Sequence, residues 1–271
     1  MTAPAATFDV NCVRLRVDDA GGSGLPVMFQ HGLCGDARQT AEAFPADGRF
    51  RRITLECRGH GSSETGELSS LSIAAFAADA GACIEKLEIG PIVVGGISMG
   101  AAIALRLAVM RPDLVRGLII ARPAWLSASA PANMRPNAEA GHLMANHAPR
   151  DALAKFMAGE TAKRLAIDGP DNLASLKGFF SREPIEVTSA LLLRISADGP
   201  GVTDDDIRAI QVPSLIIGND RDAVHPLAFA RTIAGMIPQA RLAEITAKAD
   251  DRVRYLRDFQ HVVAEFLEEF L

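Results

Sequence analysis

The feature that most restricts the fold of this chain is the alternation of short apolar segments with segments of helical periodicity. Apolar runs such as PIVVGG (91–96) and SLIIG (214–218) have the length and the continuous hydrophobicity of strands buried on both faces. Apolar residues at helical spacing follow them, for example over 99–110 and 226–236. Two alternating strands with a glycine turn, within 8–24, predict a hairpin before these units. This order predicts a doubly wound, mostly parallel α/β sheet with helices on both faces.

The alternation stops in the middle of the chain. The stretch 127–198 contains several short amphipathic patterns, among them PNAEAGHLMANHA and DNLASLKGFF, and no convincing strand pattern. A helical insertion of this length would cover one edge of the sheet. We therefore expect an α/β core formed by residues 1–126 and 199–271 and a helical cap formed by residues 127–198.

Composition and charge exclude several classes of protein. The chain has 271 residues, of which 48% are hydrophobic and 23% charged, a balance typical of a globular protein with a large core. The net charge of −5 and the lack of any Lys/Arg run argue against nucleic-acid binding. No segment reaches the ~20 apolar residues of a membrane span, and the N-terminal residues lack the pattern of a signal peptide. We expect a small-molecule substrate, no nucleic-acid partner and no membrane association, and we leave a homodimer open.

The four cysteines lie far apart in the sequence. They form no C-x-x-C pair, and no histidine stands near them in a metal-binding pattern. Isolated thiols of this kind are typical of reduced, cytoplasmic proteins. The sequence therefore predicts a cytoplasmic protein that uses neither a metal nor another cofactor.

The most specific local pattern is Gly96-Ile97-Ser98-Met99-Gly100, which fits G-x-S-x-G. An apolar strand precedes it and a helical pattern follows it, as a nucleophile elbow requires. Small residues on both flanks allow a tight turn that exposes the serine Oγ, and the N-terminus of the helix directs backbone N–H groups to the same place. The alternative is a glycine-rich turn in which Ser98 only caps the helix.

At this point the chain resembles the α/β-hydrolase superfamily, and the resemblance covers nearly its whole length. QHGLCGD (30–36) looks like the oxyanion loop of that family, and CRGHGSS (57–63) like its R-G-x-G-x-S loop. LIIGNDRDAVHP (215–226) looks like the strand end that carries its acid. These motifs occur in the order in which the family has them.

The resemblance implies a role for several residues. Ser98 would be the nucleophile, the backbone N–H groups of Leu33 and Met99 would bind the oxyanion, and Asp222 would orient a histidine. Asp220 stands on the same loop and competes with Asp222 for the position that faces the pocket. The pocket lining is expected to include His31, Gly32 and Trp125, although plain core packing is the alternative reading of an aromatic residue such as Trp125.

The chain departs from the family where the catalytic histidine is expected. The family places it just after the last strand, and this sequence reads AEITAKADDRVRYLRDF over 243–259, with Asp250 near the expected position. A carboxylate, with a pKa near ~3.9, accepts the proton of a serine poorly. His225 is the best-placed substitute, because it follows Asp222 on the same loop, and the charge of Asp222 would raise its pKa. Its other interpretation is a wall of the pocket.

Three functions are compatible with these residues. The first is a serine hydrolase that acts on an ester, a lactone or a related carbonyl compound, with an atypical or missing base. The second is a catalytically impaired, hydrolase-like protein that binds a small molecule in the same pocket. The third is a cofactor-free lyase that reuses the elbow and the pocket.

Overall fold

The computed structural model describes residues 6–271, and these residues build one sheet of eight strands in the order β1-β2-β4-β3-β5-β6-β7-β8. Strands β3 to β8 run parallel, whereas β1 and β2 form an antiparallel hairpin that joins the sheet through β4. This confirms the predicted fold class. The strands are β1 Ala6–Val10, β2 Val13–Asp19, β3 Leu25–Gln30, β4 Phe50–Leu55, β5 Ile92–Ile97, β6 Val115–Ala121, β7 Ser214–Gly218 and β8 Ala240–Glu244.

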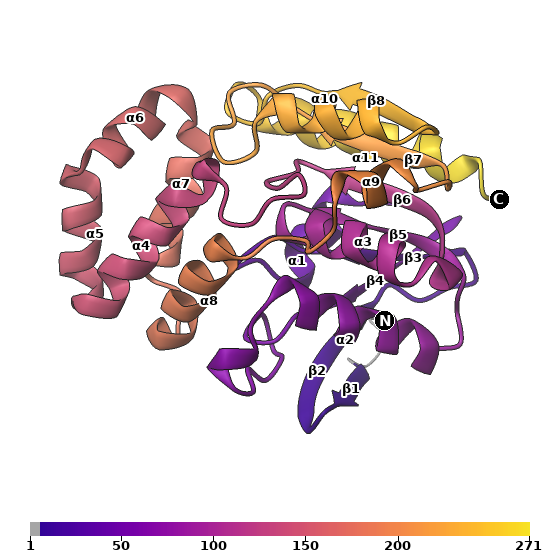
Figure 1. Ribbon diagram of the computed structural model, residues 1–271, viewed down its shortest axis with the longest axis horizontal. Helices are drawn as coiled ribbons and strands as arrows, with labels where there is room; N and C mark the ends of the chain where they lie inside the picture. Colours follow the sequence, from indigo (N-terminus) through magenta and orange to yellow (C-terminus); the bar gives the residue numbers. More distant parts are fainter. Residues whose placement is uncertain (1–5) are drawn as a thin grey trace.

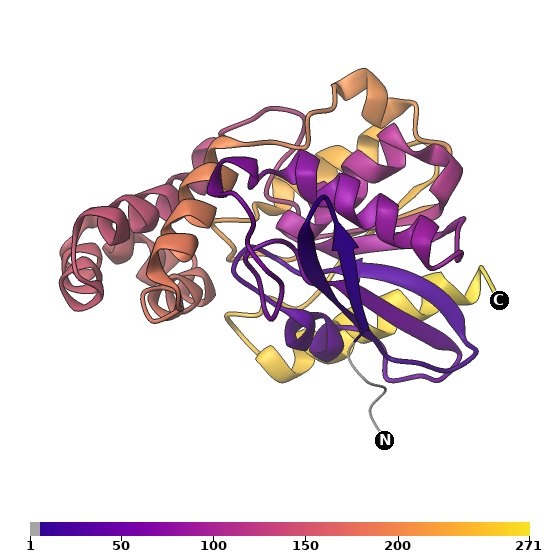
Figure 2. The ribbon, with the colours of Figure 1, turned by 90° about the horizontal axis from the view of Figure 1, so that it is seen from below.

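Helices cover both faces of the sheet (Figures 1 and 2). Figure 2 shows α11 with α1 on one side of the strands and α2 with α3 on the other. Helix α3 packs on β5 and β6, α10 packs on β7 and β8, and α11 contacts β7 from the opposite face. The flanking helices are α1 Ala37–Ala43, α2 Ile73–Lys86, α3 Met99–Met110, α9 Asp204–Arg208, α10 Leu227–Met236 and α11 Arg252–Glu268.

The core is divided by the sheet into two apolar clusters because successive side chains of a strand point to opposite faces. In β6, Leu118 and Ile120 belong to the cluster beneath α2, α3 and α10, while Ile119 belongs to the cluster beneath α1 and α11. All three side chains are at most 1% exposed. Burial on both faces explains why these strands are almost continuously apolar.

The stretch 127–198 contains α-helices and, over its whole described length, no strand. Figure 1 shows its helices extending to one side of the sheet. Helices α4 and α8 pack closely on each other, and α5, α6 and α7 follow in sequence around them. The bounds are α4 Arg135–Asn146, α5 Pro149–Ala158, α6 Glu160–Asp168, α7 Pro170–Phe179 and α8 Ile185–Ala197. Within residues 6–271, none of the helices is both long and apolar enough to cross a bilayer.

Candidate active site

Ser98 lies at a sharp turn between β5, which ends at Ile97, and α3, which begins at Met99. Its backbone has φ 58° and ψ −111°, a conformation that is costly for a residue with a side chain. The turn is held in place because the Ser98 N–H donates a 2.9 Å hydrogen bond to the carbonyl of Ala121 at the end of β6. The sheet therefore presents the Ser98 hydroxyl at the carboxyl edge of its central strands.

Gly96 and Gly100, which flank Ser98, are required because other backbone segments approach them closely. A Cβ atom on Gly100 would lie 2.3 Å from the carbonyl oxygen of Gln30, and one on Gly96 would lie 2.5 Å from the carbonyl carbon of Gly100. Real Cβ contacts are never this short, so neither site can hold a side chain unless the backbone moves. The G-x-S-x-G pattern thus reflects the packing of α3 against the end of β3.

We expect Gly100→Ala to destabilise the protein by about 2 to 3 kcal/mol, because the added methyl group has rigid backbone on its contact side. Gly235→Ala in α10 is the matched control, since a Cβ there meets nothing within 4 Å, and it should leave stability unchanged or slightly raised. Urea denaturation followed by circular dichroism measures both. Equal stability of the two variants would contradict the close approach described above.

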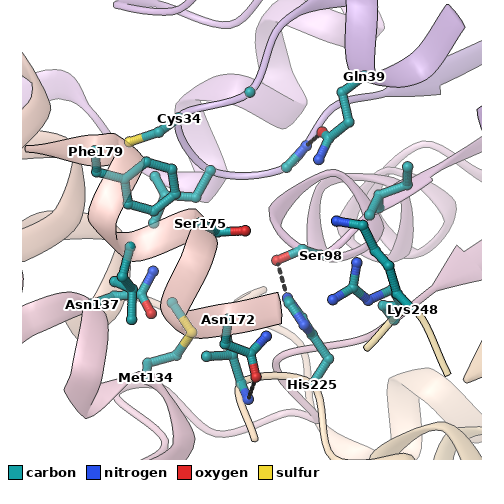
Figure 3. Close-up of a pocket in the computed structure, with 17 residues that line it drawn as sticks. Cys34, Gln39, Ser98, Met134, Asn137, Asn172, Ser175, Phe179, His225 and Lys248 are labelled. Atoms are coloured by element: carbon teal, nitrogen blue, oxygen red, sulfur yellow. Dashed lines mark hydrogen bonds between the residues drawn. The ribbon is translucent and has the colours of Figure 1, made fainter. Parts of the chain in front are cut away.

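His225 lies on the loop between β7 and α10, and its side chain reaches Ser98 (Figure 3). Its Nε2 is 2.8 Å from Ser98 Oγ, and its Nδ1 is 2.8 Å from Asp222 Oδ1. The Asp222 carboxylate can only accept a hydrogen bond, so the proton of a neutral imidazole resides on His225 Nδ1. His225 Nε2 then faces the Ser98 hydroxyl as an acceptor. The three side chains form one hydrogen-bonded chain.

Asp222, rather than Asp220, faces the site. Asp222 is 8% exposed, while Asp220 is exposed at the surface. Asp222 Oδ2 accepts a 2.7 Å hydrogen bond from Arg122 Nε, and Oδ1 accepts one of 2.8 Å from Asn172 Nδ2. Burial favours the protonated carboxyl, but the charge of Arg122 and the bonds from His225 and Asn172 outweigh it and hold the pKa of Asp222 well below its usual range.

Asn172, from α7, fixes the loop that carries the acid and the histidine. Its Oδ1 accepts the backbone N–H groups of Ala223 at 2.8 Å and Val224 at 3.3 Å, while its Nδ2 binds Asp222. The Asp222 carboxylate also accepts the backbone N–H of His225 at 3.0 Å. These bonds shape the loop so that a histidine only three residues beyond the acid reaches the serine.

The pKa of His225 shifts in the direction opposite to the expected one. The carboxylate of Asp222 does favour the charged imidazole, but burial disfavours it more strongly and the nearby Arg122 adds to that effect. The pKa is therefore lowered from 6.5. The expectation of a raised pKa was wrong because it considered the neighbouring charge and not the low exposure of the ring, whose side chain is 10% exposed.

The loop after β3 and the start of α3 supply backbone donors beside Ser98. Within residues 6–271, the N–H groups of Leu33 and Met99 have no hydrogen-bond partner. His60 Nε2 accepts the N–H of Cys34 at 3.0 Å and so holds this loop from behind. The N–H of Gly32 is bound by Gln39 Oε1 at 2.7 Å. The loop is thus fixed by its other amides, while Leu33 keeps a free donor.

A cavity of about 250 Å³ opens above Ser98 and His225, and Gly32 and Leu33 belong to its wall. Among the described residues, the lining does not include His31 or Trp125, which corrects that expectation. His31 is fully buried: its Nε2 accepts the N–H of Cys57 at 3.0 Å, and its Nδ1 donates to the Gly32 carbonyl at 2.9 Å. Trp125 is 2% exposed and donates its Nε1 hydrogen to the Asp198 carbonyl at 2.9 Å. Both rings brace loops instead of contacting a ligand.

The segment after β8 contributes a lysine to the cavity. Asp250 forms an ion pair with Arg221, its side chain is 49% exposed, and among the described residues it is not part of the cavity lining. Lys248, two residues earlier, lines the cavity, and its Nζ lies 2.8 Å from Asp171 Oδ1. The family pattern places a histidine near residue 250. In this chain the residue of that segment that lines the cavity is the cationic Lys248.

Sequence reasoning missed two residues of this site, Arg122 and Asn172. Arg122 directly follows the apolar strand β6, which is an unusual place for a charge, and this was the available signal. Its guanidinium is 8% exposed and bridges Asp222 and Asp171. Asn172 gave no signal, because its role depends on how α7 packs on a loop 50 residues away.

Comparison with known proteins agrees with this fold. Residues 26–248 match the family model for the alpha/beta hydrolase fold. "Putative non-heme bromoperoxidase BpoC" of Mycobacterium tuberculosis is 31% identical over 239 residues, which are 86% of this chain and 89% of the relative. The pimeloyl-[acyl-carrier protein] methyl ester esterase of Chromobacterium violaceum is 28% identical over 262 residues, 91% and 96% of the two chains.

Solved structures show the same fold. The enol-lactonase of Burkholderia xenovorans LB400 superposes with a TM-score of 0.75 at 22% identity and covers 97% of this chain and 100% of its own. The match to the family model spans the elbow, the loop after β3 and the loop that carries Asp222 and His225. The chain therefore belongs to the alpha/beta hydrolase fold family.

Proposed function

We propose that this protein is a serine hydrolase that cleaves an ester or a lactone, with Ser98 as nucleophile, His225 as general base and Asp222 as the acid that orients it. The observation that carries the proposal is the hydrogen bond of 2.8 Å between Ser98 Oγ and His225 Nε2, with Asp222 at 2.8 Å from the other ring nitrogen. The serine has an acceptor for its proton, and the acceptor has its tautomer fixed.

The geometry supports acyl transfer through a covalent intermediate. Ser98 Oγ attacks the carbonyl carbon while His225 Nε2 takes the hydroxyl proton. The negative charge that forms on the carbonyl oxygen is bound by the N–H groups of Leu33 and Met99. His225 then gives the proton to the leaving oxygen as the bond from this oxygen to the carbonyl carbon breaks. A water molecule that is deprotonated by the same nitrogen attacks the acyl carbon, the bond to Ser98 Oγ breaks, and His225 returns the proton to Oγ.

Asp222 stays ionised throughout this sequence because Arg122 balances its charge in a buried position. An ionised Asp222 stabilises the imidazolium that forms when Ser98 attacks, and it prevents the ring from turning. Arg122 is therefore a positioning residue that acts through the acid. The guanidinium of Arg122 also lies over the ring of Tyr255, with 5.8 Å between the guanidinium carbon and the ring centroid. This contact further fixes the orientation of Arg122.

We further propose that residues 127–198 act as a cap over a small-molecule pocket. Met134 directly precedes α4 and Asn172 lies in α7, and both residues line the cavity above Ser98. An ester substrate agrees with the name of the Chromobacterium violaceum relative, a methyl ester esterase. The cytoplasmic location stays a prediction from the sequence, and a homodimer stays open.

Hydrolysis of short p-nitrophenyl esters and of simple lactones by the wild type and by Ser98→Ala tests the function. The proposal expects wild-type turnover far above the rate of Ser98→Ala with at least one of these classes. Wild-type rates no better than those of Ser98→Ala with all of them would favour the alternative, a protein that binds a small molecule in a hydrolase-like pocket.

The pH dependence of kcat/KM is expected to reflect the lowered pKa of His225. The base works only when neutral, so activity is lost as pH falls and His225 takes up a proton. Because burial lowers its pKa, the midpoint of this acid limb should lie below pH 6.5, with a plateau above it. Rates with p-nitrophenyl butyrate between about pH 4 and about pH 9 measure the profile. A midpoint above 6.5 would contradict the burial argument.

A further inference from the structure

One face of α7 forms a wall of the cavity. Asn172, Ser175, Leu176 and Phe179 all line it, and their spacing of three and four residues places them on the same side of the helix. Met134, at the start of α4, lines the cavity beside them. Leu176 and Phe179, with Met134, form the apolar part of this wall, and Asn172 and Ser175 form a polar part.

Asn137 of α4 differs from the other polar residues of this wall in that its buried amide oxygen has no partner among the described residues. Its side chain lines the cavity, the residue is 6% exposed, and its Oδ1 is buried and has no hydrogen-bond partner among residues 6–271. Figure 3 shows Asn137 next to Met134 and, in that view, on the opposite side of the Ser98–His225 pair from Lys248. The amide therefore takes no part in the hydrogen bonds that hold Asp222.

A buried amide without a partner is unfavourable for the free protein. The unmade hydrogen bond costs about 1 to 3 kcal/mol, and a leucine of similar shape at this position would avoid this cost. By contrast, the amide of Asn172 uses both its oxygen and its nitrogen within the protein. The unsatisfied amide of Asn137 is available to a ligand in the cavity.

We propose that Asn137 determines specificity by hydrogen-bonding a hydroxyl or amide group that the substrate carries apart from its scissile carbonyl. The inference rests on the proposed function in that it places this group on the ester or lactone that Ser98 attacks. A few fixed polar groups in an otherwise apolar pocket orient a ligand, and a substrate that lacks the matching group leaves them unpaired. The substrate class is thus a polar-substituted ester or lactone and not a plain aliphatic one.

Binding to an inactive background tests this without depending on turnover. The variants Ser98→Ala and Ser98→Ala/Asn137→Leu are each titrated with two matched pairs of esters. Changes in the NMR chemical shifts of the esters measure their binding. The first pair is methyl β-hydroxybutyrate and methyl isovalerate, which differ in a hydroxyl on the acyl side. The second is hydroxyethyl butyrate and propyl butyrate, which differ on the alcohol side.

In at least one pair, Ser98→Ala should bind the hydroxylated ester more tightly, and Asn137→Leu should reduce that preference roughly tenfold. Equal effects of Asn137→Leu on both members of each pair would overturn the inference. Asn137→Ala serves as a second variant with the same expectation should leucine disturb α4, and thermal unfolding shows whether either variant folds. Because the readout is binding, a lost preference without any ester turnover by the wild type would leave this inference standing and refute the hydrolase function.

Discussion

Ser98→Ala is expected to lower kcat/KM for short p-nitrophenyl esters by about 10⁴- to 10⁶-fold, the largest effect of any single substitution. The variant removes the atom that we propose as the nucleophile, and the structure holds this Oγ 2.8 Å from His225 Nε2. The free N–H groups of Leu33 and Met99 remain, so a residual rate above the uncatalysed reaction is expected.

Ser129→Ala is the matched control for this experiment. Ser129 is exposed on the segment before α4 and lies outside the cavity lining given for the described residues. Its replacement should change kcat/KM by less than about twofold, since surface substitutions away from a site have small effects. A wild-type rate equal to that of Ser98→Ala would contradict the assignment of Ser98 as nucleophile.

His225→Ala is expected to lower kcat by about 10³- to 10⁵-fold. Without the imidazole, Ser98 loses its proton acceptor and Asp222 faces the empty position, while binding of the ester is less affected. Steady-state hydrolysis of p-nitrophenyl butyrate measures the effect. His261→Ala is the control, because the His261 side chain is 69% exposed on α11 and should be silent.

Loss of structure must be distinguished from loss of the base in this variant. His225 belongs to the loop that Asn172 holds and hydrogen-bonds Ser98, so a change in this loop would also displace Ser98. Thermal unfolding and near-UV circular dichroism should match the wild type. A folded His225→Ala that keeps wild-type kcat would reject His225, and a loss confined to Lys248→Met would point to the lysine instead.

Local patterns in the sequence were sufficient for the fold and for the elbow. Continuously apolar strand patterns between helical patterns indicate a sheet that is buried on both faces. These patterns can be recognised without knowing which distant segments are in contact. Gly96 and Gly100 around Ser98 report close backbone approach at one place in the chain. The backbone that Gly100 approaches belongs to the distant Gln30, but the glycines that allow this approach stand together in one short motif, which is why the elbow could be predicted.

The partner of Ser98 could not be chosen from the sequence with the same certainty. Whether His225 reaches Ser98 depends on the shape of the loop after β7, and that shape is imposed by Asn172 from the separate helix α7. The sequence left open whether His225 was a base or a wall of the pocket, and only the relative placement of two distant segments distinguishes these readings.

Buried side chains show the same limit. His31 and Trp125 lie next to site residues in the sequence, yet their polar atoms satisfy backbone groups behind the cavity. A position in a motif indicates proximity to the site but not the direction of a side chain. For Arg122, a charge at the end of a buried strand required a partner, but the sequence did not identify Asp222 as that partner.

The most direct test of the Ser98–His225 pair is the rate at which a fluorophosphonate modifies Ser98, followed by mass spectrometry of the intact protein and of its peptides. This reaction isolates the attack of the serine from every later step. We predict one adduct per chain, on Ser98, in the wild type, and modification about 10²-fold slower or more in folded His225→Ala. Equal rates in the two proteins, or an adduct on any residue other than Ser98, would contradict the assignment.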